Sequence, residues 1–161
     1  MKFDLRQIFE SDNSVRNFEY EYDCDDELIS SPVSVSGYIK NSSGVVSVSA
    51  VAELTVSTQC AKCAKQICKK LRVPVEHFLT THLDNEEDDD EYILVEDNVL
   101  NLDDLVTEDI FLELPSRFLC KPDCEGLCPL CGKDLNDGKC SCKKQIDPRL
   151  AALQQLLSDD E

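Results

Sequence analysis

The stretch FLCKPDCEGLCPLCGKDLNDGKCSC, residues 118–142, holds six of the chain's ten cysteines and decides how the C-terminal part of the chain can fold. Within it, Cys128 and Cys131 are separated by two residues and followed by Gly132. This spacing is typical of a zinc knuckle, a tight turn in which two thiolates converge on one ion and a glycine supplies a positive φ. Because the stretch contains few apolar residues, we expect a bound metal to supply the stabilisation that a hydrophobic core supplies elsewhere.

A second pair with the same spacing, Cys60 and Cys63, lies far upstream and needs the same explanation. A structural zinc ion takes four thiolates in tetrahedral geometry, so ten cysteines allow two sites and leave two residues over. The two left over are most simply Cys24 and Cys68, although Cys68 can instead pack as a small apolar residue. The predicted division is Cys60, Cys63, Cys120 and Cys124 for one ion, and Cys128, Cys131, Cys140 and Cys142 for the other.

Each predicted set has a structural purpose, but other uses of the cysteines stay open. The second set closes a small loop by itself, whereas the first would clamp the end of a hairpin to the exit of a later helix. In the main alternative, the four cysteines within residues 120–131 share one ion and leave Cys60 and Cys63 as a thiol pair. Iron in a rubredoxin-like centre also fits four thiolates. A redox role for the upstream pair is a further alternative, because residues 61–70 can start a helix after a strand, but no thioredoxin-like pattern surrounds the pair.

The chain has 161 residues, of which 42% are apolar, and a formal net charge of −17. This length suits one domain with a small module, or two small domains. We place a β-rich domain at residues 1–115 and a cysteine-rich zinc module with a C-terminal helix at residues 116–161. The sequence has no apolar run long enough to span a membrane and no N-terminal signal peptide pattern. We therefore expect a cytoplasmic protein, in which clustered cysteines bind metal more often than they form disulfides.

The strong negative charge repels nucleic-acid phosphates and suits a basic partner such as a ribosomal protein. Basic residues nevertheless border both cysteine pairs, in clusters at residues 62–72 and 139–149. In one interpretation they balance the charge of anionic zinc–thiolate centres, and in the other they form two small surfaces for RNA or protein. The predicted nucleic-acid contacts are Lys62, Lys65, Lys143 and Lys144.

Hydrophobic periodicity predicts an α+β protein whose N-terminal half is rich in antiparallel hairpins. The predicted elements are a short helix at 5–9, a strand at 18–22, a hairpin at 32–58 with its turn at 41–44, a strand at 67–79 broken near Pro74, a strand at 92–95, a helix at 101–114 capped by Asn101, and a helix beginning at Asp147 and Pro148. The acidic run at residues 84–91 lacks the spaced ligands and the glycine of a calcium loop, so we expect a solvated acidic loop there.

The sequence contains no residue pattern typical of an enzyme. It has two histidines and five glycines, and the glycines do not form a phosphate-binding loop. Zinc sites built from four cysteines leave no open coordination position for catalysis. We therefore expect neither enzymatic activity nor a small-molecule substrate.

Several motifs together resemble one known family. They are the helix at residues 101–115 ending in Leu-Glu-Leu-Pro, the central pair Cys60-Ala-Lys-Cys63, the signature from Cys124 to Asn136 followed by Cys140-Ser-Cys142, and Asp147-Pro-Arg-Leu-Ala. These motifs resemble the YceD family, also called the large ribosomal RNA subunit accumulation proteins.

The resemblance implies a role in the accumulation of 23S ribosomal RNA, with ribosomal RNA or a large-subunit ribosomal protein as partner and no established enzymatic activity. Some relatives lack the C-terminal cysteine cluster but keep the central pair, which implies that the second set is a separable module. The sequence departs from the family at Lys62, where an arginine is usual. A lysine keeps the positive charge but not the two-pronged hydrogen bonding of arginine, so an RNA phosphate contact at this position is in doubt.

Overall fold

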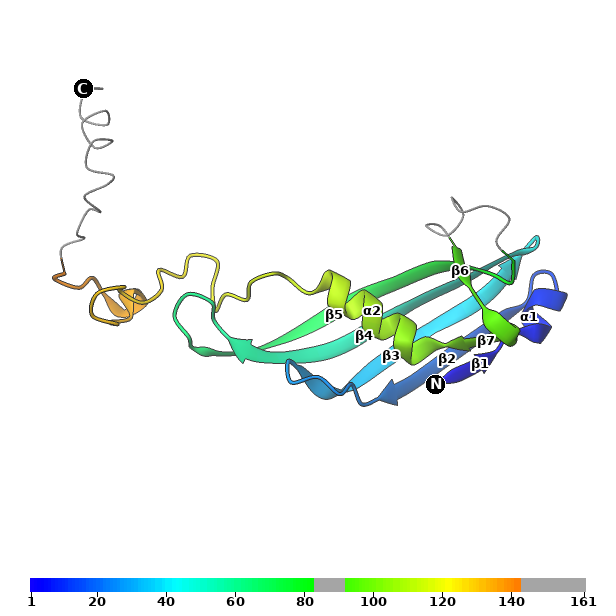
Figure 1. Cartoon of the computed structure of the whole chain (residues 1–161), viewed down its shortest axis with the longest axis horizontal. Coiled ribbons are helices and arrows are strands. Elements are labelled where there is room, and N and C mark those ends of the chain that lie inside the picture. Colours follow the sequence, from blue (N-terminus) through cyan, green and yellow to red (C-terminus); the bar gives the residue numbers. More distant parts are fainter. Residues whose placement is uncertain (83–91, 143–161) are drawn as a thin grey trace, which may run out of the picture.

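The computed structural model describes residues 1–82 and 92–142 and shows an elongated, strand-rich molecule (Figure 1). Within the described residues, five strands form one sheet in the order β2-β3-β4-β5-β6. Their bounds are Val15–Tyr22 (β2), Ile29–Ser42 (β3), Val45–Gln59 (β4), Gln66–Thr80 (β5) and Tyr92–Leu94 (β6). The strands from β2 to β5 pair antiparallel, and the short β6 pairs parallel with the end of β5. The predicted β-rich N-terminal half is therefore confirmed.

Strict alternation along β4 determines which face of the sheet is buried. Its buried side chains are Val46, Val48, Ala50, Ala52, Leu54 and Val56. Successive side chains of a strand point to opposite faces, so the serines and threonines between these residues lie on the other face. Each buried aliphatic side chain of this kind contributes about 1.5–3 kcal/mol. At the hairpin turn, Gly44 N donates to Asn41 Oδ1 at 2.9 Å, which is the turn that the sequence predicted.

The helix α2, Leu102–Glu113, packs against the apolar face of the sheet (Figure 1). It buries Leu102, Leu105, Val106 and Ile110. Two polar contacts attach it to the sheet, from Tyr22 Oη to Thr107 Oγ1 at 2.9 Å and from His77 Nε2 to Asp109 Oδ2 at 2.8 Å. The predicted helix is confirmed at this position.

The start of α2 differs from the prediction in its cap. Asn101 occupies the N-cap position, but its side chain does not accept a hydrogen bond from the helix backbone. Instead, Asn101 Nδ2 donates to the carboxylate of Asp104. The side-chain amide therefore stabilises an acidic residue of the first turn, and the predicted capping bond is wrong.

Smaller elements close the same apolar core. The helix α1, Arg6–Glu10, contributes the buried Ile8 and confirms the short N-terminal helix. A two-stranded sheet pairs β1, Lys2–Asp4, with β7, Val99–Asn101. The 3-10 helix η2, Glu96–Asn98, connects β6 to β7.

The predicted break near Pro74 is wrong, because β5 runs through this residue without interruption. Pro74 lies opposite Val51 of β4. On its other side, β5 pairs with β6 only at residues 78–80. Proline lacks the N–H needed by a central strand but is accommodated on an open edge. The sequence shows the proline but not the edge position that tolerates it.

Several predictions fall outside the described residues. They concern the acidic loop at residues 84–91, the helix beginning at Asp147 and Pro148, and the two lysines at 143 and 144. The division into residues 1–115 and 116–161 stays a prediction. Among residues 1–82 and 92–142, every helix is too short or too polar to cross a membrane.

Candidate metal centres

Two knuckles in different parts of the chain share one backbone geometry. In both, the N–H of the first cysteine donates to the carbonyl five residues later, and its own carbonyl accepts from the N–H four residues later. The bonds are Cys60 N to Lys65 O (2.8 Å), Ala64 N to Cys60 O (2.9 Å), Cys128 N to Lys133 O (2.8 Å) and Gly132 N to Cys128 O (2.9 Å). The sequences CAKCAK and CPLCGK therefore form the same tight turn, as their common C-x2-C spacing predicted.

The residue after the second cysteine has a positive φ in both knuckles. It is Gly132 with φ 71° in one and Ala64 with φ 56° in the other. Glycine adopts this conformation at no steric cost, whereas an L-residue pays about 1–2 kcal/mol. The first knuckle is thus the more strained of the two.

The first set of cysteines joins the end of the β4–β5 hairpin to the segment that follows α2. Cys60 Sγ lies 3.8 Å from Cys124 Sγ, and Cys63 Sγ lies 3.5 Å from Cys120 Sγ. All four sulfurs lie within 4.8 Å of one another. A tetrahedral centre with metal–sulfur bonds of about 2.3 Å separates its sulfurs by about 3.8 Å, so the donor set fits a zinc ion.

The second set closes the loop at the C-terminal end of the described residues. The sulfurs of Cys128, Cys131, Cys140 and Cys142 also lie within 4.8 Å of one another. Cys128 is buried, whereas Cys131 and Cys142 are exposed. In the described part of the chain, these two groups of four are the cysteine groupings that can hold a metal ion, and they match the predicted division. The alternative grouping of the four cysteines within residues 120–131 is not the arrangement in the structure.

Backbone hydrogen bonds favour one ionised sulfur in each set. Burial opposes ionisation of the Cys60 thiol, but backbone N–H groups directed at its sulfur, that of Cys120 first among them, lower its pKa to about 6. The N–H groups of Leu130 and Cys131 lower the pKa of Cys128 to about 6 in the same way. Both shifts favour the thiolate, the form that binds metal.

Other sulfurs of the same sets are harder to ionise. Burial, followed by hydrogen bonding with neighbouring thiols, raises the pKa of Cys120 to about 12. Hydrogen bonding with Cys131, followed by desolvation, raises the pKa of Cys142 to about 12. Negative charges this close repel one another, so four thiolates are stable together only beside a cation.

The two cysteine sets are in direct contact through the segment from Cys124 to Leu127. Lys62 Nζ donates to the carbonyl of Cys124 at 2.9 Å, and Leu127 N donates to the carbonyl of Lys62 at 3.1 Å. Gly126 lies within this segment and has φ +80°. A Cβ added to it would lie 2.9 Å from the carbonyl oxygen of Lys62. This segment carries Cys124 of the first set and leads directly into Cys128 of the second, so a shift of one set is passed to the other.

A salt bridge and an amide reinforce this contact. Lys65 Nζ lies 2.9 Å from Asp134 Oδ2 and 3.9 Å from Asp137 Oδ1. The hydrogen bond from Lys65, followed by that from the backbone N–H of Asn136, lowers the pKa of Asp134 to about 2. Asn136 Nδ2 donates to Cys124 Sγ at 3.4 Å. The two aspartates and Asn136 belong to the loop of the second set, whereas Lys65 and Cys124 belong to the first.

Comparison with known proteins identifies the family. Residues 48–157 match the family described as "Large ribosomal RNA subunit accumulation protein YceD". The chain belongs to the YceD family. The matched region includes all eight cysteines of the two sets, so both centres lie within the part of the chain that defines the family.

Two similar proteins are both described as uncharacterized. The uncharacterized protein YlbN of Bacillus subtilis is 34% identical over 159 residues, which cover 97% of this chain and 92% of that protein. An uncharacterized protein of Mycobacterium tuberculosis is 33% identical over 122 residues, which cover 74% of this chain and 58% of that protein. The chain thus spans little more than half the length of this mycobacterial relative. No solved structure matches the chain.

The structure gives two of the predicted RNA-contact lysines of this YceD-family chain internal partners. Lys62 and Lys65 are both exposed, but their ammonium groups bind Cys124 and Asp134 within the contact between the two sets. Neither ammonium group contacts a sulfur in these bonds, and RNA contact by these two lysines stays a prediction. Lys143 and Lys144 lie outside the described residues.

The cysteines left over by the prediction lie away from both centres. Cys24 is half-buried and packs against the main core. Cys68 is exposed on β5, with its Sγ 3.8 Å from Ser57 Oγ, so its predicted alternative as a packed apolar residue is wrong.

Sequence reasoning missed the residues that connect the two sets, namely Gly126, Asp134 and Asn136. The pattern Asp134-Leu-Asn136 offers one signal, because an aspartate that accepts from the N–H two residues later forms a tight local turn. That bond, from Asn136 N to Asp134 Oδ1, is 2.9 Å long. The pattern predicts the turn but not its partner in the first set.

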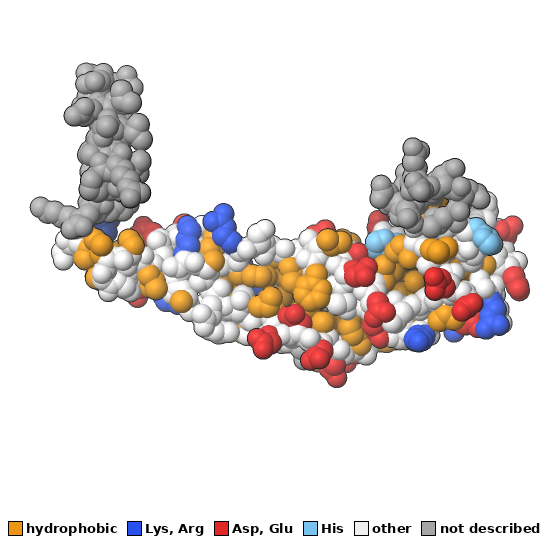
Figure 2. Space-filling model, viewed as in Figure 1, with side chains coloured by type: hydrophobic (Ala, Val, Ile, Leu, Met, Phe, Trp, Pro, Cys, Tyr) orange, Lys and Arg blue, Asp and Glu red, His pale blue; other side chains and the backbone are white. Residues whose placement is uncertain are grey.

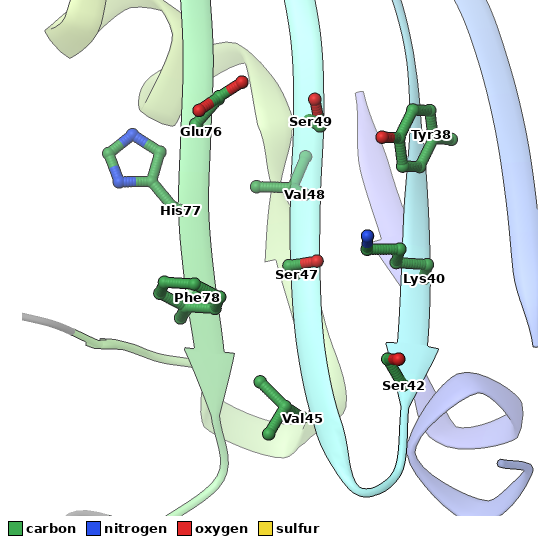
Figure 3. A pocket seen from close by; sticks show the side chains of 10 residues that line it. All are labelled: Tyr38, Lys40, Ser42, Val45, Ser47, Val48, Ser49, Glu76, His77 and Phe78. Atoms are coloured by element: carbon green, nitrogen blue, oxygen red, sulfur yellow. The ribbon is translucent and has the colours of Figure 1, made fainter. Parts of the chain in front are cut away.

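A shallow hollow of about 420 Å³ lies over β3, β4 and β5 (Figure 3). Ser47 and Ser49 belong to the polar face of β4 and lie between larger side chains of the neighbouring strands. The largest are the aromatic rings of Tyr38, which is 37% exposed, and Phe78, which is 50% exposed. Lys40 and Glu76 give the hollow charges of opposite sign. It is open to solvent and differs from the enclosed pockets that bury most of a small ligand.

Proposed function

We propose that this YceD-family chain is a non-enzymatic factor that supports accumulation of large-subunit ribosomal RNA, and that each cysteine set binds one structural Zn²⁺. Family membership supports the ribosomal role. The observation that carries the metal proposal is the grouping of eight cysteines into two sets of four sulfurs, each within 4.8 Å. Thiolate ligands in tetrahedral spacing suit zinc, and iron is the alternative that metal analysis distinguishes.

The composition of the sets supports a structural rather than a catalytic role for the metal. A catalytic zinc site keeps one position for water or substrate, whereas four cysteine ligands fill all positions. Zinc would hold together residues 118–142, in which the large apolar side chains of Leu127 and Leu130 are exposed. When bound, it supplies the folding free energy that burial does not supply there.

The geometry disfavours the redox alternative for Cys60 and Cys63. Reactive C-x2-C pairs lie at a helix N-terminus, where the helix dipole lowers the thiol pKa. Here the knuckle leads into β5, which begins at Gln66, and not into a helix. Each of the two sulfurs also faces a cysteine of the later segment, Cys60 with Cys124 and Cys63 with Cys120.

The charge of the molecule supports a basic protein as the direct partner. The net charge is −17, and acidic side chains are spread over the face shown in Figure 2. Such a surface attracts a basic ribosomal protein and repels RNA phosphates. In this proposal the effect on ribosomal RNA is exerted through a protein partner in the cytoplasm, and small-molecule substrates have no part.

A complementation experiment tests this proposal. In a bacterium lacking its own YceD-family gene, the wild-type chain should restore the ratio of 23S to 16S ribosomal RNA. The paired change Cys60→Ser and Cys63→Ser should fail to restore it, whereas Cys68→Ser, outside both sets, should behave as wild type. Metal analysis of the purified wild-type protein should find two zinc ions per chain. Restoration of the ratio by the paired variant would show that the first set is dispensable for function.

A further inference from the structure

We propose that the two cysteine sets bind their metal ions cooperatively, and that Asn136 carries much of the coupling. This inference rests on the metal binding proposed above. Asn136 lies in the 3-10 helix η3, Leu135–Asp137, inside the loop that the second set closes. Its side-chain amide nevertheless donates to Cys124 Sγ, a sulfur of the first set, at 3.4 Å. One side chain thus links the loop of one centre to a ligand of the other.

The position of Asn136 is fixed on both sides of the contact. Toward the second set, its backbone N and its Nδ2 both donate to Asp134 Oδ1, at 2.9 and 2.7 Å. Toward the first set, its Oδ1 accepts from the N–H of Glu125 at 3.0 Å, next to Cys124 in the chain. Cys124 is 1% exposed, so the amide contacts its sulfur away from bulk water. A hydrogen bond from a neighbouring side chain orients a metal ligand.

Further contacts carry the coupling through the backbone. Leu135 N donates to the carbonyl of Gly126 at 2.9 Å, and Leu127 and Asp134 form an isolated β-bridge. Lys65 of the first knuckle is held by Asp134 at 2.9 Å. The loop of the second set therefore contacts the first set by its backbone, by a salt bridge and by the amide of Asn136.

The loop depends on its own metal for order, and this dependence creates the coupling. Residues 132–139, GKDLNDGK, contain one large apolar side chain, that of the half-buried Leu135. Closing the second set removes the conformational freedom of the loop and places Asn136 against Cys124. An ion bound in one set thus prepares a ligand of the other, and linkage makes the effect equal in both directions. Partners that orient metal ligands typically change affinity about 10–100-fold, which is the expected coupling factor.

Native mass spectrometry of the full chain during Zn²⁺ titration measures this factor directly. At half saturation, two equal and independent sites put about half of the molecules in the one-metal state, and unequal sites put more there. Coupling by factors of about 10 and 100 lowers this fraction to about a quarter and about a tenth. We expect a wild-type fraction between these two values.

The isosteric change Asn136→Asp tests the residue itself. It keeps the shape and the acceptor for Glu125 but replaces the donor to Cys124 with a carboxylate. The one-metal fraction should rise toward one half. The control Asp123→Asn makes the reverse change beside Cys124, where the side chain is 81% exposed, and should leave the wild-type fraction unchanged.

Reciprocity provides a second test that does not depend on one variant folding well. Replacing Cys140 and Cys142 with serine should weaken Co²⁺ binding by the first set, read from thiolate charge-transfer absorption. Replacing Cys60 and Cys63 with serine should weaken binding by the second set by the same factor. Unchanged affinities in both variants would refute the coupling while leaving metal binding intact. A wild-type chain that binds no metal would instead refute the proposed zinc sites, and the coupling with them.

Discussion

Replacing Gly126 by alanine should separate the two cysteine sets, and Gly132 provides a matched control. Both glycines have a positive φ, +80° for Gly126 and +71° for Gly132. An alanine at either position carries a strain of about 1–2 kcal/mol. Alanine also restricts the unfolded chain, which offsets about 0.4–1 kcal/mol of this strain. The backbone conformation alone thus costs roughly 1 kcal/mol in each variant, from the difference of these two values.

The surroundings of the added Cβ distinguish the two variants. At Gly132 no atom lies within 4 Å, whereas at Gly126 the Cβ would lie 2.9 Å from the carbonyl oxygen of Lys62 and 3.2 Å from its Cβ. Relief requires the segment to move away from Lys62, which breaks the 3.1 Å bond from Leu127 N to that carbonyl. A lost hydrogen bond costs about 0.5–1.5 kcal/mol, and an unsatisfied buried group costs more. We therefore expect Gly126→Ala to cost about 1–2 kcal/mol more than Gly132→Ala.

Thermal unfolding of the zinc-loaded proteins at one fixed zinc concentration measures this difference. For a chain of this size, 1 kcal/mol shifts Tm by about 2–4 °C. Gly132→Ala should lower Tm by about 2–4 °C and Gly126→Ala by about 4–12 °C. The Gly126 variant should also release zinc faster to a chelator, because its contact with the first knuckle is disturbed. Equal shifts for both variants would show that the close approach to Lys62 does not hold the two sets together.

Three further predictions concern the metal centres. Cys60→Ser should reduce bound zinc from two ions per chain to one by metal analysis, with Cys68→Ser unchanged at two; two ions in both would contradict the assignment of Cys60. Ala64→Gly relieves the strain of a positive φ but gives the unfolded chain more freedom, for a net gain in stability of about 0.5–1 kcal/mol. It should therefore raise Tm by about 1–4 °C, and a lower Tm would refute the strain. Zinc uptake by the first set at pH 7.5 should release at least two but fewer than four protons in calorimetry with buffers of different ionisation enthalpy. The pKa of Cys63 is raised and that of Cys120 is about 12, so both sulfurs give up protons when zinc binds, whereas the pKa of Cys60 is lowered to about 6. Zinc affinity should therefore fall further below pH 6, where the Cys60 sulfur also binds a proton. Release of four protons would contradict the lowered pKa of Cys60.

The strands and the local knuckles could be predicted from the sequence because they depend on nearby residues. Alternation of apolar residues from Val46 to Val56 places one face of β4 in the core in any register that buries it. The C-x2-C spacing likewise fixes a tight turn through bonds that span five residues, as in Cys60 N to Lys65 O at 2.8 Å. The break expected at Pro74 was wrong because tolerance of proline depends on the neighbouring strand, which the local sequence does not show.

By itself, the sequence determined the strand-rich core and the existence of two knuckles, and its motifs pointed to the YceD family. It did not determine which cysteines come together, since two groupings satisfied the same spacing. Tertiary structure decided this, because the antiparallel β4 and β5 hold Cys60 beside a segment about sixty residues later, where Ala61 N donates to the carbonyl of Phe118 at 2.9 Å. It also decided the partners of Lys65 and Asn136. Bonds across such separations depend on the packing of the whole chain, whereas a turn or a strand depends on the residues that form it.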